Sequence, residues 1–582
     1  MKKKQVLLMS ILSVSLLFSA CTQKRDDQAS FDKYLDSLPT RLISNDSMNL
    51  EFLFEDPSKY GFQDELLTLP FSTKEDYEQS KKDAEQILKE LDQFYYPSLS
   101  DKQKLTFDVL QDNLKRGMKL TEFFDLDNNY LGSFIGFQAQ LPMLLNEYTF
   151  ERKHDLDSYF HILETSEEVF LKYAENEKYR QSKGTGMSQT ILNKVIEQCE
   201  NFISSNDSFL IDRMNERIDQ VTFLSDSEKV TAKKRNEELV NNHLNQAYRS
   251  LKEQLQTIDA RKDDFGLASL PNGKAYYESL LQVKTGLDMN VSEVRSYLES
   301  RIYKLQLQLL SIMQEDESAL DSLKNELVFT TLTSTEEVLD YLKDVMKRDY
   351  PFIDNLNYEI TKVPEALSAN FSPAAYLMGK IDAPISAPEH IYINGDFSQD
   401  LFPTIAHEGY PGHMYQHTYY KQQNYPTVRY LLDYNGYSEG WATYVERNSI
   451  LQYTPKENTA AFQLYRINNE LVSIYIGLAD IGIHYDGWDR AKFTSYMEEL
   501  FGEGTLAQED LDSQYDIILE TPTNYLQYYL TSFKFQDLYD KAQQELGSTF
   551  SSVAFHEVIL KTGPSPFHII EEKVEQYIKQ AK

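Results

Sequence analysis

The last third of the sequence contains a cluster of metal-ligating and acid–base side chains. Residues 407–413 read His-Glu-Gly-Tyr-Pro-Gly-His. Two imidazoles with a carboxylate beside the first are the groups that bind zinc and accept a proton in metal-assisted hydrolysis. The common form of this motif places its histidines four residues apart on one helical face. Here the spacing is six, which on an ideal helix turns the second histidine about 120° away from the first.

Gly409, Pro411 and Gly412 indicate that the helix opens between the two histidines. Pro411 cannot donate a hydrogen bond to the carbonyl of His407 and clashes with it. Two looped-out residues would return His413 to the face that carries His407. One alternative is a helix that ends at Gly409, followed by an unrelated helix.

A second alternative pairs His413 with His417, four residues further on. We favour His407 with His413, because only that pair places Glu408 next to a ligand. His417 is then expected to be a surface residue.

A third metal ligand is expected downstream, where residues 438–446 read Ser-Glu-Gly-Trp-Ala-Thr-Tyr-Val-Glu. Glu439 follows His413 by 26 residues, enough for a turn and an antiparallel helix. Glu446 lies seven residues later on the same face, where it could hydrogen-bond a ligand from behind. Taken alone, both would be helix N-terminal charges that favour the dipole. The neighbouring His-Glu motif favours the ligand role instead.

Helical periodicity dominates the sequence that must position these residues. Capping-box spacing recurs at Ser72 with Glu75, Ser100 with Gln103 and Ser334 with Glu337. A short strand is predicted over 388–395, and a helix is expected to begin near Ser398. Helices are predicted near 73–95, 101–124, 155–181, 226–260, 291–315 and 335–348. The predicted fold is mainly α, a large multi-helical body with a small β element next to the metal-site helix.

The composition restricts the possible partners. The chain has 582 residues, with 58 Lys and Arg against 91 Asp and Glu, a net charge of −33. Such a surface repels nucleic acid and anionic lipid headgroups. Two cysteines exclude a disulfide scaffold and a Cys-rich zinc module. The alternating βαβ pattern of a solute-binding protein is missing.

The N-terminus has the pattern of a secretory signal. Lys2–Lys4 precede an apolar stretch, and small residues precede Cys21. This arrangement resembles the lipobox of bacterial lipoproteins, with Phe18 where Leu is usual; a plain signal peptide cut near Ala20 is the alternative. We expect a signal peptide over 1–20 and a tether over 21–30 lipidated at Cys21, for example with palmitate. The protein would then be extracytoplasmic, held to the membrane by lipid alone.

The remaining residues, 31–582, are predicted to form one large helical domain. Its part 31–350 would be a scaffold and its part 351–582 the metal-site half. Cys199, the other cysteine, is expected to be an inert core residue on a helix. The oligomeric state does not follow from the sequence.

The two motifs together resemble the bacterial "domain of unknown function 885" family, which looks related to the zincin metallopeptidases. The resemblance extends from about residue 30 to 578. It departs from the family at Thr531, where Gly is usual. Weaker supporting stretches are FSPAAYLMGKID (371–382), DIGIHYDGW (480–488), PTNYLQYYLT (522–531) and FHEVILKTGPSPF (555–567).

The resemblance implies a zincin-like metallopeptidase body that holds one Zn²⁺ ion through His407, His413 and Glu439. Glu408 would be the general base that activates a metal-bound water for attack on a peptide. The donor to the developing oxyanion would be Tyr528 or, as a second choice, His556. His556 could equally be a packed histidine.

Supporting roles behind the ligands are expected for Glu446, Asp480 and His484. The predicted function is that of a membrane-anchored zinc metallohydrolase that cleaves peptides. The alternative is a non-catalytic metal-containing or peptide-binding lipoprotein.

Overall fold

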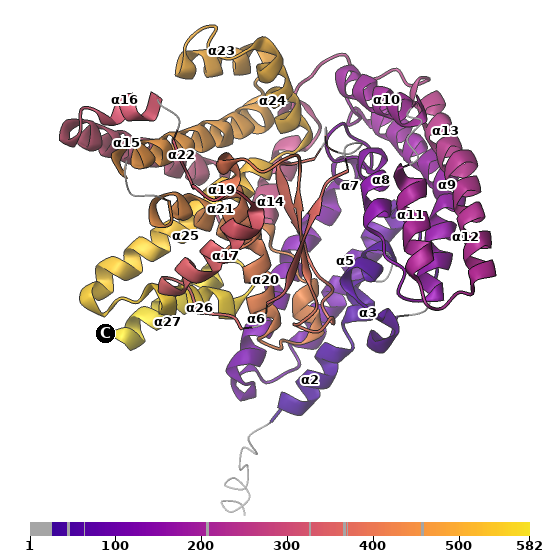
Figure 1. Ribbon diagram of the computed structural model, residues 1–582, viewed down its shortest axis with the longest axis horizontal. Helices are drawn as coiled ribbons and strands as arrows, with labels where there is room; N and C mark the ends of the chain where they lie inside the picture. The colour runs from indigo at the N-terminus through magenta and orange to yellow at the C-terminus, as the bar shows by residue number, and fades with distance from the viewer. Residues whose placement is uncertain are drawn as a thin grey trace, which may run out of the picture.

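The structure is a computed structural model that describes residues 26–43, 47–62, 65–204, 209–324, 327–354, 356–364, 368, 371–454 and 459–582. The predicted signal peptide and Cys21 lie outside these residues. The described chain is mainly α-helical with one small sheet (Figure 1), which confirms the predicted fold class. None of the described helices is long and apolar enough to span a membrane.

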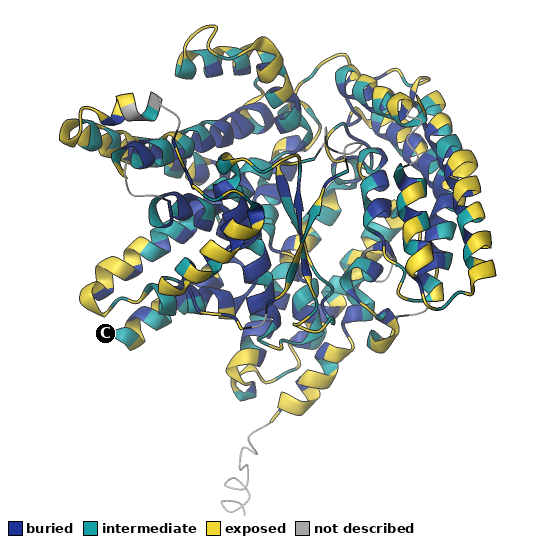
Figure 2. Ribbon diagram, in the orientation of Figure 1, coloured by how far each residue is buried: buried dark blue, intermediate teal, exposed yellow. Residues whose placement is uncertain are grey.

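Helices at both ends of the chain share the largest hydrophobic core. This core runs from Phe31 to Ile578 and therefore takes residues from both sides of residue 350. Figure 2 shows that the helices around the metal motif are largely buried. The principal helices are α2 (Gln28–Asp36), α5 (Lys74–Leu91), α6 (Asp101–Leu120), α14 (Gly273–Thr285), α15 (Val291–Glu315), α17 (Thr335–Val345), α19 (Phe402–Glu408), α20 (His413–Lys421), α21 (Asn435–Gln452), α22 (Thr459–Ile481), α25 (Asn524–Leu546), α26 (Ser552–Thr562) and α27 (Phe567–Ala581).

A block of helices beside the sheet has a second core of its own (right in Figure 1). Cys199 is buried in it, as predicted, and burial raises the pKa of its thiol to about 12. The helix predicted near 226–260 is present as α12, a π-helical turn over Leu239–Leu244, and α13. The helices of this block are α8 (Phe137–Glu147), α9 (Lys153–Lys183), α10 (Gln189–Ser204), α11 (Phe209–Gln220), α12 (Asp226–Glu238) and α13 (Asn245–Leu255).

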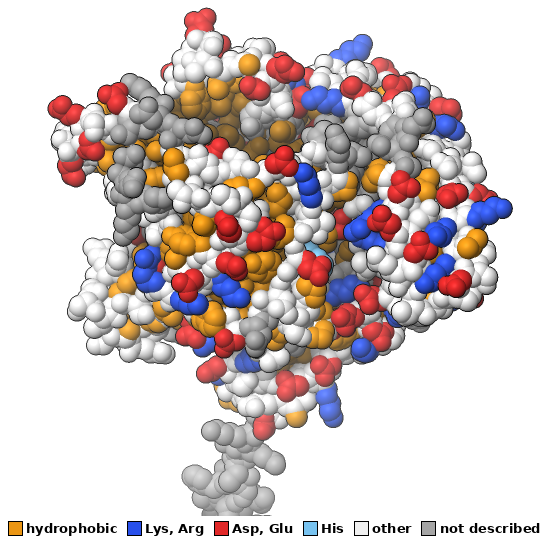
Figure 3. All heavy atoms as spheres, in the orientation of Figure 1, with side chains coloured by type: hydrophobic (Ala, Val, Ile, Leu, Met, Phe, Trp, Pro, Cys, Tyr) orange, Lys and Arg blue, Asp and Glu red, His pale blue; other side chains and the backbone are white. Residues whose placement is uncertain are grey.

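Smaller elements complete the described chain. A third cluster packs α23 and α24 against α22. On the face seen in Figure 3, hydrophobic side chains gather towards the middle and acidic groups are scattered around them. The remaining helices with α geometry are α3 (Pro39–Leu42), α4 (Ser47–Leu53), α7 (Phe124–Asp127), α16 (Ala319–Lys324), α23 (Arg490–Phe501) and α24 (Gln508–Glu520).

Capping chemistry sets several helix starts. Ser100 and Gln103 form the predicted reciprocal box at the start of α6. Ser334 accepts a hydrogen bond from the backbone N–H of Glu337, as expected for an N-cap. The first predicted box is wrong by one residue, since Thr73, not Ser72, caps α5 and pairs with Asp76. Thr and Asp satisfy the same capping chemistry as Ser and Glu, so spacing alone left the choice open.

The sheet has three strands in the order β1-β3-β2. The strand predicted over 388–395 is β3 (Glu389–Ile393), which pairs in parallel with β1 (Tyr358–Lys362) and antiparallel with β2 (Ala374–Leu377). β3 is therefore the central strand. Its buried side chains fit that position. β2 forms one edge of the sheet and contacts α19.

Candidate metal centre

The helix that carries His407 ends at the glutamate of the motif. α19 stops at Glu408, and α20 begins at His413 after a four-residue turn. The helix therefore breaks, as in the alternative considered from the sequence. The second helix is nevertheless not unrelated, because the rings of His407 and His413 lie with their centroids 4.8 Å apart.

Gly412 allows the chain to turn so tightly. A Cβ at this position would lie 1.7 Å from the carbonyl oxygen of His407, so any other residue would push the two histidines apart. The indole N–H of Trp441 donates to the carbonyl of Pro411 at 3.0 Å and ties the turn to α21. A close backbone approach of this kind is a recurrent reason for glycine.

α21 supplies both carboxylates predicted from the sequence. Glu439 Oε2 lies 3.2 Å from His413 Nε2 and 3.9 Å from His407 Nε2. Glu446 Oε2 lies 2.9 Å from the other ring nitrogen of His407, Nδ1. If Nδ1 carries the proton that binds Glu446, the Nε2 lone pair is directed to the site.

The distances fit a tetrahedral ion. Two ligands each about 2.0–2.1 Å from zinc are separated by about 3.4 Å, close to both separations from Glu439 Oε2. That oxygen is buried and makes no hydrogen bond among the described residues. An anionic oxygen without a donor is an expensive group to bury, and an ion between it and the two imidazoles would satisfy it.

Glu408 also approaches the histidines, and atoms of His407, Glu408 and His413 lie within 4.8 Å of one another. Two carboxylates thus compete for the third ligand position. Glu408 Oε2 already accepts a hydrogen bond from the backbone N–H of Tyr376 at 2.8 Å. Glu439 has the oxygen without a donor and the shorter contacts, so it would be the better ligand, and Glu408 would then lie beside the ion.

The electrostatics keep the centre charged. Burial opposes the ionisation of Glu439, but His413 and His407 outweigh it and hold its pKa below the ordinary value. Burial likewise lowers the pKa of His407, whereas its bond to Glu446 and the charges of Glu408, Glu446 and Glu439 raise it to about 9. Without an ion, the carboxylates attract a proton to this imidazole.

Tyr528 on α25 reaches the centre, as the resemblance implied. Burial, Glu439 and Glu408 raise the pKa of its hydroxyl, and it is within hydrogen-bonding reach of Glu439. α25 packs tightly against α21, because a Cβ at Gly440 would meet Thr531 Oγ1 at 2.3 Å. Thr531, the departure noted in the sequence, is thus a buried contact between these two helices and not part of the centre.

His556 does not reach the centre. Its Nε2 pairs with the hydroxyl of Tyr444 at 3.0 Å and its Nδ1 with the carbonyl of Asp349 at 2.7 Å. Tyr350 stacks on its ring at 4.1 Å. The oxyanion role considered for it is replaced by the alternative, a packed core histidine, because both ring nitrogens are already used.

Asp480 and His484 lie in a separate structural cluster. Asp480 accepts from the hydroxyl of Tyr277 and from the backbone N–H of Thr523 at 2.9 Å. His484 bonds the carbonyl of Ile518 at 2.8 Å. No contact of either with the ligands is found among the described residues. Asp480 instead accepts a backbone hydrogen bond at the N-terminus of α25, the helix that carries Tyr528.

His417 is not the surface residue expected from the sequence. Its Nδ1 lies 2.8 Å from the hydroxyl of Tyr376, which also bonds Glu389 at 2.5 Å. This arrangement turns His417 towards the sheet and away from His407 and His413. Sequence reasoning missed Tyr376, whose only signal was its place in the stretch 371–382.

The fold and the centre together define a mainly α-helical protein with two histidines and three carboxylates gathered at a helix break. The chain belongs to the family described as "Bacterial protein of unknown function (DUF885)", whose model matches residues 58–574. No curated protein matches the sequence.

Two solved structures share the fold. One is described as a "putative lipoprotein" from Colwellia psychrerythraea, with a TM-score of 0.79, 18% identity, and coverage of 95% of this chain and 100% of that chain. The other, from Shewanella oneidensis, is described as a "putative lipoprotein of unknown function", with a TM-score of 0.59, 16% identity and coverage of 95% and 99%. At these identities the likeness is one of fold.

Proposed function

We propose that this protein is a zinc-dependent hydrolase of peptides. The observation that carries the proposal is the buried oxygen of Glu439, which lacks a hydrogen bond and faces the Nε2 atoms of His407 and His413 at 3.9 and 3.2 Å. His407, His413 and Glu439 would hold the ion. When bound, zinc would supply Lewis acidity and lower the pKa of a coordinated water.

Glu408 is suited to act as the base. It directly follows a ligand and accepts the backbone N–H of Tyr376, which fixes its carboxylate. In this role it takes the proton from the attacking water and passes it to the departing amine. Binding of a metal alone would need the ligands but not a carboxylate held in this way.

Tyr528 is suited to stabilise the oxyanion that forms on the attacked carbonyl. Because burial and the nearby carboxylates raise the pKa of its hydroxyl, it stays protonated and can donate. β2 provides a sheet edge next to Glu408, and extended peptides bind such edges by adding a strand. Both features favour a peptide as substrate.

Metal analysis and a peptide-library digest of the same preparation test the proposal. We expect about one zinc per chain, cleavage by the wild type, and loss of cleavage without loss of zinc in Glu408→Gln. Full metal content in His407→Ala or Glu439→Ala would refute the ligand set. If Glu408→Gln cleaves as fast as wild type, the assigned base is wrong. A zinc-loaded wild type without cleavage would favour a metal-containing binding lipoprotein.

We further propose that lipid on Cys21 holds the protein on the outer side of the cytoplasmic membrane. The likeness to two structures described as "putative" lipoproteins supports this, together with the signal pattern before Cys21. Cells grown with labelled palmitate should yield labelled protein, and Cys21→Ala should abolish the label. Label that persists in this variant would contradict the anchor.

A further inference from the structure

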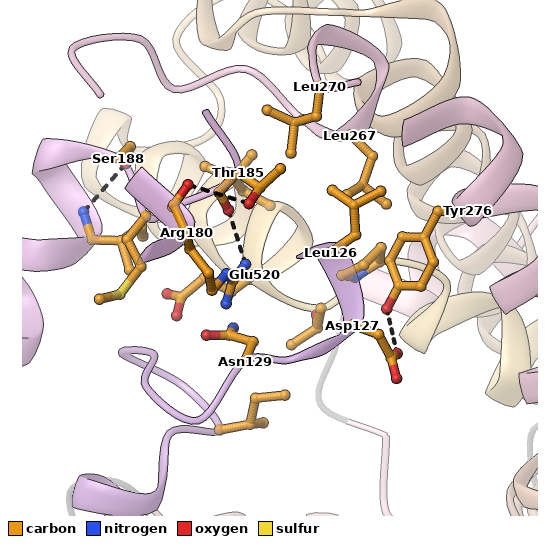
Figure 4. A pocket seen from close by; sticks show the side chains of 18 of the residues that line it. Leu126, Asp127, Asn129, Arg180, Thr185, Ser188, Leu267, Leu270, Tyr276 and Glu520 are labelled. Atoms are coloured by element: carbon orange, nitrogen blue, oxygen red, sulfur yellow. Dashed lines mark hydrogen bonds between the residues drawn. The ribbon is translucent and has the colours of Figure 1, made fainter. Parts of the chain in front are cut away.

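A second feature is a cavity of about 390 Å³ between the helical block and the main body. Its walls come from α7, α9, α14, the loop before α14, and the junction of α24 with α25 (Figure 4). Its size is within the range of small-molecule and peptide subsites. The residues assigned to the metal centre are not among those that line it.

Arg180 of α9 points into this cavity, among Asn129, Thr185 and Glu520 (Figure 4). Only 7% of Arg180 is exposed. Its Nη2 donates to the carbonyl of Thr185 at 2.9 Å, whereas its buried Nε and Nη1 have no hydrogen-bond partner in the part of the chain that the structure describes. No carboxylate of the described chain lies within ion-pair distance of its guanidinium. Since arginine stays charged in proteins, a buried fork with two unused donors calls for an anion.

The acidic residues in the cavity wall are already occupied by donors. Asp127 accepts the hydroxyls of Tyr276 and Tyr77 at 2.8 and 2.9 Å. Glu520 accepts the backbone N–H of Ser133 at 2.5 Å and also its hydroxyl. Neither carboxylate therefore pairs with the Arg180 guanidinium, whose charge is partly offset at longer range by Glu177 on the same helix.

Arg261, which also lines the cavity, adds a second positive charge. Its buried Nε has no hydrogen-bond partner among the residues described, and its Nη1 lies 3.3 Å from Asp263. Burial lowers the pKa of Arg261, and the charge of Arg180 lowers it further, against the effects of Asp263, Asp264 and Glu177. Two guanidinium groups that repel each other across a cavity favour a carboxylate, which can accept two parallel hydrogen bonds.

Two of the residues that line the cavity neighbour residues of the metal centre. Lys284, on the last turn of α14, lines the cavity. Burial raises the pKa of Asp433, Lys284 lowers it and Glu439 raises it, so Asp433 is near both residues. Gln527, another lining residue, directly precedes Tyr528 on α25. Arg180 interacts instead with Tyr276, at the other end of α14.

The length of the cavity wall that α14 forms can be compared with the length of an extended peptide. From Tyr276 to Lys284 the rise of α14 is about 12 Å, at about 1.5 Å per residue. An extended peptide covers about 3.3–3.6 Å per residue. The path along α14 therefore accommodates three to four residues.

We propose that Arg180 and Arg261 bind the C-terminal carboxylate of a peptide substrate. The inference rests on the proposed hydrolase function and gives it a substrate class, short peptides with a free C-terminus. The peptide would lie along the cavity with its C-terminus at the arginines and its scissile bond at the metal centre. Cleavage should then fall at a fixed distance from the C-terminus, at least three residues from it.

Binding to the inactive Glu408→Gln protein tests the carboxylate site apart from catalysis. The probes are one fluorescent decapeptide as the free acid, as the C-terminal amide, and as the amide with one interior Glu. We expect the amide to bind weaker by on the order of 10- to 100-fold, as expected for loss of a hydrogen bond to a charged group. Arg180→Gln should weaken binding of the free acid by a similar factor and leave the affinity for the amide unchanged.

Lys183→Gln is the matched control, because Lys183 is exposed on the same helix. It should leave all three affinities unchanged. Unaltered melting temperature and amide affinity would show that Arg180→Gln is folded. As a second measurement, mass spectrometry of wild-type digests should find C-terminal fragments of one length from free-acid peptides of different sequence.

The outcomes separate the two proposals. Equal binding of free acid and amide, or equal loss of both in Arg180→Gln, overturns the carboxylate site even if peptides are cleaved. Binding of the interior-Glu amide as tightly as the free acid overturns its assignment to the C-terminus. Arg180-dependent binding without cleavage by zinc-loaded wild type supports the site and refutes the hydrolase.

Discussion

The hydrogen bond between Glu446 and His407 offers a direct test of the proposed metal centre. Glu446 Oε2 lies 2.9 Å from His407 Nδ1, on the side of the ring opposite Glu439. In Glu446→Gln the carbonyl of the amide can still accept this bond, but the negative charge that makes the imidazole a better ligand is lost. The ring orientation is kept, so the change isolates the charge.

The structure sets the expected size of the effect. Loss of such a partner behind a ligand typically weakens metal binding by about 10- to 100-fold, or about 1.4–2.7 kcal/mol. The side chain of Glu446 is 34% exposed, so water already screens part of its charge. We therefore expect Glu446→Gln to lie near the tenfold end, and Glu446→Ala, which also frees the ring, towards the hundredfold end.

Competition with a chromophoric chelator measures zinc affinity over this range. The control is Glu336→Gln, which removes an exposed carboxylate from the first turn of α17 and should bind zinc as the wild type does. Zinc affinity of Glu446→Gln within twofold of wild type would refute the reasoning. So would an equal loss in the control, which would attribute the effect to net charge.

Three further predictions follow from single contacts. Gly412→Ala should reduce zinc affinity at least as much as Glu446→Ala, because a Cβ would lie 1.7 Å from the carbonyl oxygen of His407; normal zinc binding by a folded variant would contradict this. Burial lowers the pKa of His484 and of His556 to about 4, so each folded-state pKa lies below its unfolded value and stability is lost as pH falls from about 6.5 to 4. The loss is on the order of 3 kcal/mol for each, and the urea midpoint of the metal-free protein should fall less steeply with pH in His556→Gln; an identical pH dependence would argue against it. Burial raises the pKa of Asp480 to about 7 against its bonds from Tyr277 and Thr523, so its carboxyl should make the folded state less stable as pH rises from about 4 to 7; a midpoint profile unchanged in Asp480→Asn would disprove this.

The sequence was sufficient for features that depend on near neighbours in the chain. The helix predicted over 291–315 is present with the same bounds, as Val291–Glu315. The Ser100 cap and the buried position of Cys199 were also predicted correctly. Apolar spacing and capping act over three or four residues, so a single sequence records them.

The sequence also identified residues that the structure brings together. His407, His413, Glu439 and Glu446 meet, because the helix break and the antiparallel return of α21 left few other arrangements. The spacing could not decide how the helix opens. Gly412 permits that turn only because the chain passes directly over the carbonyl of His407.

Other features depended on tertiary packing. Tyr376 donates to Glu408 from a strand 32 residues earlier in the chain. His556 does not reach the centre, because both of its ring nitrogens bond residues of other segments. Arg180 lies in a different helical block, and nothing in its own surroundings in the sequence marks it as different from other arginines. What sets it apart is burial with two donors that have no hydrogen-bond partner among the described residues, a property that exists only once distant helices pack together. The sequence by itself thus determined the chemistry of the proposed metal centre, whereas the tertiary structure decided which groups support it and where a substrate could be held.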